Sequence, residues 1–184
     1  MSSSTANRAL ILGGLFTVLL VADQLSKIWA IETMAGSPPR HYLGGILTLT
    51  YAENTGGWGS LGANWSPLVR RFTLIVAPAF VLLGLGVYLV KTEEFDWWRS
   101  VGYVGIISGG VGNLIDRFRL DHVVDFLYMG YGSIGTNIFN IADMGILFGF
   151  ILVIYRSWAL SKLEKAAEPQ LAGLMEAPNH RETC

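Results

Sequence analysis

The feature that most constrains this chain is a run of 19 residues, Phe72–Val90, without a charged side chain. A helix of that length rises about 28 Å, close to the thickness of the bilayer hydrocarbon core. Hydrophobic residues make up 52% of the chain and charged residues only 15%. This composition is typical of integral membrane proteins and not of soluble domains. The net charge of −1 gives no reason to expect a nucleic-acid partner.

Apolar segments predict four transmembrane helices, at about residues 9–31, 67–90, 97–116 and 137–158. The beginning of the first, Ala9–Ala22, could also be the hydrophobic region of a signal peptide. Against this, apolar residues continue at helical spacing beyond it, so we expect a retained helix. These residues are Leu25, Ile28 and Trp29.

Ser66 and Pro67 are suited to the N-cap and first position of the second helix, and Pro78 could kink it. The charged segment 161–184 is predicted to be a cytoplasmic tail, with a short amphipathic piece followed by disorder.

Two segments between the helices are long enough to have structure of their own. In residues 32–66, the alternating sequence Ile46–Tyr51 predicts a strand. It leads into the glycine-rich sequence Asn54–Gly59, which is either a loop aimed at a site or a plain surface turn. Residues 118–136 are predicted to form the second extramembrane loop.

Asn140 and Asp143 stand out because they interrupt an otherwise apolar run from Ile138 to Tyr155. An ionisable group in such a run costs roughly 2.5–3.5 kcal/mol, which favours a functional role. Asp125 lies in the apolar sequence V-V-D-F-L just before this run. The two carboxylates are therefore candidates for a pair that shares protons.

The four-helix arrangement gathers the remaining polar residues at one membrane surface. Asp23 and Lys27 are four residues apart on the first helix and share a face. With the fourth helix beginning at Asn137, Asn140 and Asp143 would lie roughly 4.5 and 9 Å deep. Asn54 and three residues at the end of the third helix belong to the same end: Asn113, Asp116 and Arg117. Intrahelical and interfacial ion pairs remain alternatives for Lys27 and Asp116.

The distribution of Lys and Arg gives a weak preference for an orientation with both termini inside the cell. In that orientation the inner segments hold seven of these residues and the outer segments five. The polar cluster would then face outward.

The chemistry available to this cluster favours an aspartic protease. The three histidines lie outside the predicted helices and the single cysteine is Cys184, so neither a Ser-His-Asp triad nor a thiolate site is indicated. Asp and Asn oxygens could bind a metal, but Arg117 would oppose a cation. Two neighbouring carboxylates cannot both ionise, so one acts as base and the other donates a proton. The sequence does not assign these two roles.

Five motifs together resemble the lipoprotein signal peptidases, the type II signal peptidases of bacteria. The resemblance covers residues 9–160, and the motifs stand in the order of that family. They are D-Q-L-S-K (Asp23–Lys27), N-T-G-G-W-G (Asn54–Gly59), G-G-V-G-N-L-I-D-R (Gly109–Arg117), V-V-D-F (Val123–Phe126) and F-N-I-A-D (Phe139–Asp143).

The resemblance implies an all-α membrane protease with four transmembrane helices, a small extracytoplasmic β cradle and a loop helix. It implies an inner-membrane enzyme, monomeric and without metal or cofactor, whose active site faces the periplasm. Its substrates would be diacylglyceryl-modified prolipoproteins, cut before the lipidated cysteine, and globomycin-type cyclic peptides would inhibit it. Asp125 and Asp143 become the catalytic pair. The supporting residues become Asp23, Asn54, Asn113, Arg117 and Asn140, with Lys27 and Asp116 less defined in role.

Two features depart from the family pattern. The loop after Asn54 often reads small-small-Phe-Ser in this family, but here it reads Gly57-Trp58-Gly59-Ser60. The tail after Leu160 is longer than the fold needs. Neither departure involves the carboxylate pair.

Two other functions are compatible with buried carboxylates. A proton-coupled transporter would use Asp23, Asp116 and Asp143 as a relay, but it needs polar residues at several depths, and the second helix has none from Ile75 to Gly86. A non-catalytic assembly factor would use Asp–Arg pairs to hold helices together, and would leave Asp143 without a nearby cation in the membrane-embedded part of its own helix.

Overall fold

The computed structural model describes residues 3–92 and 96–175. Its first helix, α1 (Ser3–Met34), runs without a break for 32 residues. Asp23 and Lys27 are only 1% and 2% exposed, and Lys27 Nζ lies 2.9 Å from Asp23 Oδ2. The face that these two residues share therefore points into the protein.

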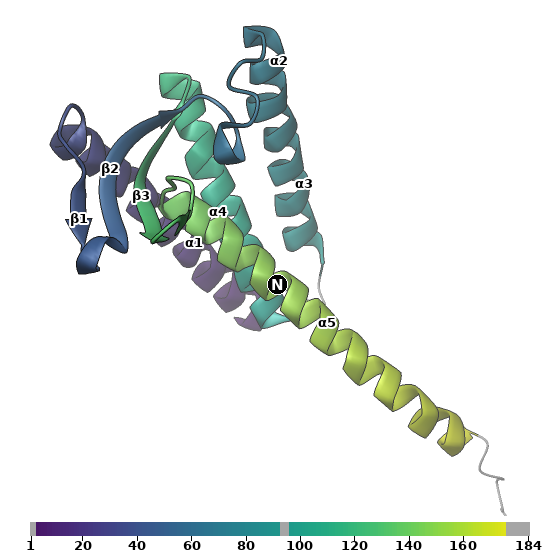
Figure 1. Cartoon of the computed structure of the whole chain (residues 1–184). Coiled ribbons are helices and arrows are strands. Elements are labelled where there is room, and N and C mark those ends of the chain that lie inside the picture. The colour runs from purple at the N-terminus through teal and green to yellow at the C-terminus, as the bar shows by residue number, and fades with distance from the viewer. Residues whose placement is uncertain (1–2, 93–95, 176–184) are drawn as a thin grey trace, which may run out of the picture.

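A small antiparallel sheet covers one end of the helices (Figure 1). Its strands are β1 (Arg40–Tyr42), β2 (Leu47–Asn54), β3 (Val123–Tyr131) and β4 (Ile134–Gly135), in that spatial order. The predicted strand at Ile46–Tyr51 is confirmed as β2, which continues to Asn54.

The segment predicted as a loop, residues 118–136, differs from that prediction because it contains β3 and β4. The apolar residues of β3 explain the difference. Val124 and Phe126 pack against Ala30 and Met34 of α1, so this strand buries one face on the helix.

Strand pairing places two of the predicted site residues together. Asp125 of β3 lies directly opposite Ala52 of β2, and Asn54 is two residues farther along β2 on the same face. The residues that precede the last helix join β3 as well. Phe139 and Leu127 exchange two backbone hydrogen bonds of 2.8 Å. The sheet thus holds both the Asp125 segment and the approach to Asp143.

The second membrane helix is built from three consecutive pieces: α2 (Pro67–Arg71), a π-helical turn η3 (Phe72–Val76) and α3 (Ala77–Lys91). It begins at Pro67, as predicted. The π turn lies just before Pro78, which has no N–H to donate to the preceding turn. In the preceding segment, the helical turns are η1 (Leu43–Gly45) and η2 (Trp58–Ser60), each of three residues.

The last two helices are α4 (Trp97–Leu120) and α5 (Ile141–Met175). Helix α5 starts four residues after the predicted Asn137, because residues 137–140 approach along β3. Asp143 therefore lies in the first turn and not two turns deep. At its other end α5 continues to Met175, into the segment predicted as a tail, and extends away from the other helices (Figure 1). Residues 176–184 lie outside the described residues.

Within residues 3–92 and 96–175, three helices are long and apolar enough to cross a membrane: Ala6–Met34, Pro67–Lys91 and Ile141–Ala167. The chain is therefore a mostly helical membrane protein. The predicted third span, α4, is 24 residues long, but its glycines and its charged C-terminal turns lower its hydropathy. A count of four spans stays a prediction.

Three neighbouring glycines of α4 face three different helices. A Cβ at Gly109 would collide with the carbonyl oxygen of Ala142 in α5. At Gly110 it would meet Leu82 of α3, and at Gly112 it would lie 2.5 Å from Asp23 Oδ2 of α1. Glycine is needed here for close approach, as the sequence predicted.

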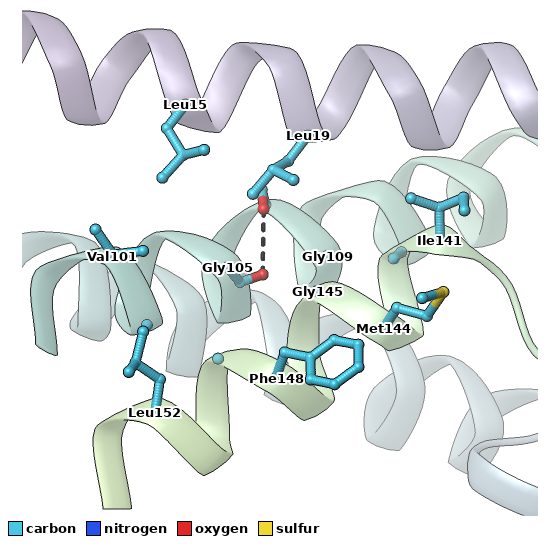
Figure 2. Close-up of a pocket in the computed structure, with 14 residues that line it drawn as sticks. Leu15, Leu19, Val101, Gly105, Gly109, Ile141, Met144, Gly145, Phe148 and Leu152 are labelled. Atoms are coloured by element: carbon cyan, nitrogen blue, oxygen red, sulfur yellow. Dashed lines mark hydrogen bonds between the residues drawn. The ribbon is translucent and has the colours of Figure 1, made fainter. Parts of the chain in front are cut away.

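From Gly109 toward the start of α4, the helices α1, α4 and α5 line an apolar cavity of about 390 Å³ (Figure 2). Leu15 and Leu19 of α1 lie on one side of it, and Phe148 and Leu152 of α5 on another (Figure 2).

A second polar cluster ties the helices together at the opposite end of α4. Asp96 accepts a hydrogen bond from the Arg99 N–H at the start of α4 and pairs with Arg156 of α5. Arg8 of α1 donates to Ser100 Oγ at 2.8 Å. These contacts fix the three helices at the end away from the sheet.

Candidate active site

Asn140 and Asp143 form the cap of α5. Asn140 Oδ1 accepts a hydrogen bond from the Asp143 N–H at 2.9 Å, and Asp143 Oδ2 accepts one from the Asn140 N–H at 3.2 Å. This reciprocal arrangement satisfies two N–H groups that a helix terminus otherwise leaves unpaired. It also gives the Asp143 carboxylate a fixed position in the first turn, where the helix dipole favours a negative charge.

Asp125 lies on β3 and is 2% exposed. Its Oδ2 accepts a hydrogen bond from Asn54 Nδ2 at 3.0 Å, and its Oδ1 accepts one from Asn140 Nδ2 at 2.7 Å. Asn140 therefore contacts both carboxylate residues, and it is itself fully buried. This single side chain joins the strand that carries Asp125 to the helix that carries Asp143.

Burial raises the pKa of Asp125 to about 6, and the nearby charge of Asp143 acts in the same direction. Hydrogen bonds from Asn54 and Asn140 and the charge of Lys27 oppose this rise. A carboxyl group in this range can be protonated close to neutral pH, which suits a proton donor.

Asn54 also organises the glycine-rich loop. Its Oδ1 accepts from the Gly56 N–H at 3.1 Å, and its Nδ2 donates to the Gly57 carbonyl at 3.2 Å. A Cβ at Gly56 would lie 2.5 Å from the backbone of Ser60, so the tight turn requires glycine. The loop is thus aimed at the site and is not a plain surface turn.

Lys27 is the centre of a buried ionic cluster. Its Nζ lies 2.9 Å from Asp23 Oδ2, 2.9 Å from Asp116 Oδ2 and 3.0 Å from Asn113 Oδ1. Asn113 in turn donates to Asp143 Oδ1 at 2.8 Å. The cluster is therefore continuous with the candidate catalytic pair.

The two acidic residues of this cluster also hold backbone groups. Asp23 Oδ1 accepts from the Ala142 N–H at the start of α5, at 2.9 Å. Asp116 Oδ2 accepts from the Val124 N–H of β3, at 3.2 Å. The cluster thus attaches the segments that carry Asp125 and Asp143 to α1 and α4, so Asp116 does more than form an ion pair near the end of its helix.

Arg117 reaches from α4 to the glycine-rich loop, where its Nη2 donates to the Gly56 carbonyl at 2.9 Å. Its charge acts on Asp143, Asp125 and Asp116. Its Nε is buried and has no hydrogen-bond partner among the described residues. The guanidinium therefore both supports the loop and places positive charge beside the pair.

A cavity of about 390 Å³ gives access to Asp125. It lies between β2, β3, the glycine-rich loop and the residues that precede α5. It is lined by Ala52, Glu53, Asn54, Gly59, Ser60, Asp125, Tyr128, Thr136, Asn137 and Ile138. Its mixed polar and apolar wall is suited to a peptide segment.

All nine residues singled out in the sequence meet in this network, and their catalytic and supporting roles stay predictions. Sequence reasoning missed Gln24, whose Nε2 donates to Asp23 Oδ2 at 3.1 Å and to Asp116 Oδ1 at 3.2 Å. Its position between Asp23 and Lys27 in D-Q-L-S-K was the available signal. Among the residues described, no group of three His, Cys, Asp or Glu side chains is placed to hold a metal ion.

Comparison with known proteins identifies the family. The model of the signal peptidase (SPase) II family matches residues 15–159. Lipoprotein signal peptidase of Streptococcus pyogenes serotype M6 is 35% identical over 143 residues, which is 77% of this chain and 89% of that protein. The protein of the same name from serotype M5 is 34% identical over the same shares.

Two solved structures have the same fold. A bacterial membrane enzyme solved by the in meso method at 2.3 Å resolution has a TM-score of 0.69 at 20% identity, over 95% of this chain and 94% of that one. A second, solved at 1.9 Å, has a TM-score of 0.68 at 24% identity, over 79% and 91%. At these identities the likeness concerns the fold alone.

Fold and site together define a helical membrane protein with a carboxylate pair, one member buried and the other half-buried, where its helices meet a small sheet. The chain belongs to the signal peptidase II family. It is therefore a multi-pass bacterial membrane protein of a protease family, and the resemblance seen in its five motifs is confirmed.

Proposed function

We propose that this protein is an intramembrane aspartic endopeptidase that removes signal peptides from diacylglyceryl-modified prolipoproteins and cuts before the lipidated cysteine. One observation carries the mechanism: Asn140 joins the buried carboxylate of Asp125 and the half-buried carboxylate of Asp143 in one hydrogen-bonded unit. Membership of the family, whose curated members are named lipoprotein signal peptidases, supports the substrate class.

The pair performs acid–base chemistry on a water molecule and a peptide bond. One carboxylate takes a proton from the attacking water while the other, protonated, donates to the carbonyl oxygen. The raised pKa of Asp125 supports such sharing, because it keeps a proton available near neutral pH. No metal or organic cofactor takes part in these steps.

The position of the site matches a substrate held by lipid. The pair lies where the helices meet the sheet, so a scissile bond must be presented at membrane-surface height. A lipid-anchored cysteine fixes that height and reduces the entropy lost in positioning. The enzyme acts as a monomer, and globomycin-type cyclic peptides compete for the same cavity.

The decisive experiment compares amide variants of three aspartates on a diacylglyceryl prolipoprotein, with mass loss of the signal peptide as the readout. Asp125→Asn and Asp143→Asn each lower turnover by about 10²–10⁴-fold or more, because an amide cannot take or share the proton. Asp121→Asn is the matched control, since Asp121 is an exposed carboxylate at the end of α4 whose left-handed backbone also suits Asn.

The control keeps wild-type turnover, and all three variants keep a cooperative thermal melt in detergent. An unlipidated prolipoprotein, run in parallel, is cut far more slowly. Near-normal turnover by either Asp125→Asn or Asp143→Asn would exclude the aspartic mechanism.

The same proposal includes the membrane orientation. Helix α4 also crosses the membrane, which makes four spans, both termini face the cytoplasm, and the sheet and active site face the periplasm of the bacterial inner membrane. The support is that the candidate site collects at the sheet end of the helices, away from the Asp96–Arg156 end.

Cysteine labelling tests this orientation in a Cys184→Ser background. An impermeant reagent applied to intact cells labels His41→Cys on β1, because β1 is exposed and outside. It does not label Thr92→Cys at the end of α3 until the cells are opened. The reverse pattern would invert the topology.

A further inference from the structure

Besides its two ion pairs, Lys27 makes a hydrogen bond to Asn113, a residue that contacts Asp143. A lysine ammonium has three N–H donors and no acceptor. All three donors of this buried side chain find acceptors, on Asp23, Asp116 and Asn113. The third acceptor is the amide oxygen of Asn113. Because an amide has an acceptor at one end and a donor at the other, a hydrogen bond at its oxygen fixes where its NH₂ group points.

The orientation of the Asn113 amide determines one of the hydrogen bonds that Asp143 accepts. Because Lys27 can only donate, Asn113 must turn its oxygen toward Lys27 and its NH₂ toward Asp143 Oδ1. The other Asp143 oxygen accepts from the Asn140 backbone N–H, which also can only donate. Asp143 thus accepts at both oxygens, from one amide polarised by a cation and from one N–H at a helix N-terminus.

Asp125 has a weaker set of donors. Its two hydrogen bonds come from the neutral amides of Asn54 and Asn140, which are oriented by the N–H groups of Gly56 and Asp143. Burial and the charge of Asp143 raise the pKa of Asp125 to about 6.

Other charged groups near the pair do not reverse this difference. The charge of Arg117 on α4 interacts with both carboxylates. The charge of Lys27 on α1 also lowers the pKa of Asp125, but less than the hydrogen bonds from Asn54 and Asn140 do. Asp23 and Asp116 are held by Lys27, and Glu53 of β2 lines the cavity on the side of Asp125.

We propose that Asp143 is the general base and Asp125 the general acid, and that Lys27 is a positioning residue that acts through Asn113 to keep the negative charge on Asp143. This inference rests on the proposed aspartic mechanism and assigns the roles that the sequence left open.

The resulting reaction balances in two steps. Water oxygen attacks the carbonyl carbon, a water proton moves to Asp143, and the Asp125 proton moves to the carbonyl oxygen, which gives a neutral gem-diol. Asp143 then gives its proton to the leaving nitrogen as the C–N bond breaks. A hydroxyl proton of the gem-diol returns to Asp125, which restores the starting state.

The test is the pH dependence of kcat/KM on a lipidated substrate. The acidic limb of the profile reports the base and the alkaline limb reports the acid. Lys27→Met/Asp116→Asn removes the cation without changing the net charge of the cluster, and Asp116→Asn alone is its matched control, which keeps Lys27 on Asn113.

We expect the acidic limb of the double variant to lie higher than that of Asp116→Asn by roughly 0.5–1 pH unit, because the base has lost the charge that favours its ionised form. The alkaline limb moves up by less than the acidic limb, because the charge of Lys27 acts only weakly on Asp125. Asn113→Leu, which keeps both ion pairs of Lys27, gives the same upward shift and serves if the double variant does not fold.

An acidic limb that coincides in the double variant and its control, or a shift of the alkaline limb instead, overturns the inference. Failure of the proposed function is a separate result: it is seen as turnover by Asp143→Asn. An inactive Asp143→Asn with an unmoved acidic limb rejects only the role given to Lys27.

Discussion

Helices α3 and α4 are neighbours, yet their environments are opposite. Helix α4 buries ten residues, whereas within Ala77–Lys91, a range that the structure describes in full, no residue of α3 is buried. Glycines show the same contrast. A Cβ at Gly84 or Gly86 of α3 would meet open space. A Cβ at Gly105 of α4 would lie 2.9 Å from the Gly145 carbonyl oxygen of α5.

The difference between α3 and α4 reflects the different surroundings and residues of the two helices. Apolar side chains of α3 are covered by lipid in a membrane, so the helix needs length and hydropathy more than exact contacts. Helix α4 carries Asn113, Asp116 and Arg117, and must hold them at hydrogen-bonding distance from α1, α5 and the sheet. Glycine provides that precision because it lets helix backbones touch.

The substitution that we expect to have the largest effect on stability and turnover is Gly109→Ala in α4. The added methyl group collides with the Ala142 carbonyl oxygen, one residue before Asp143, so α4 and α5 must separate. We expect a loss of about 1–3 kcal/mol or more of stability. Turnover falls by about 10²-fold, since a displacement near 1 Å is enough to misplace a catalytic group.

The control is Gly84→Ala in α3, the same substitution without a neighbour. It leaves turnover unchanged, and the melting temperature stays the same or rises, since alanine favours a helix by up to about 1 kcal/mol. Melting in detergent and turnover of a lipidated substrate measure both. Equal damage at the two sites would contradict the contrast between the helices.

A smaller loss of stability is expected from Gly110→Ala, where α4 contacts α3. In Gly110→Ala the new methyl group meets carbons of the Leu82 side chain at 2.7 Å, on α3. The end of this half-buried leucine side chain can move aside more easily than a backbone carbonyl, so we expect a cost below about 1 kcal/mol and turnover close to that of the native protein. A loss as large as that of Gly109→Ala would show that α3 is held as firmly as α5.

Much of this architecture could be predicted from local pattern. Apolar length located three of the helices, alternation located β2, and the cost of placing polar groups in an apolar run marked Asn140 and Asp143. The glycines of α4 indicated close approach. The choice of Asp125 as partner of Asp143 depended on the order of five motifs, since a carboxylate in an apolar setting is not specific on its own.

The errors share one cause. Within the expected loop, residues 123–131 and 134–135 form strands, because β3 pairs with β2 and with β4. Helix α5 begins at Ile141 and not Asn137, because Phe139 pairs with Leu127 of β3. Strand pairing joins residues far apart in sequence, so no local pattern contains it.

The sequence by itself determined that this chain enters a membrane and that it carries acidic, amide and basic groups near the ends of its helices. Period, length and charge are local properties, and they are readable before folding. Only the tertiary structure decided that Lys27 meets Asp116 and Asn113 as well as Asp23. It also decided that Asn140 joins the segments that carry Asp125 and Asp143. Hydrogen bonds act over about 3 Å, so which polar groups become partners depends on how closely the glycines let α4 approach its neighbours.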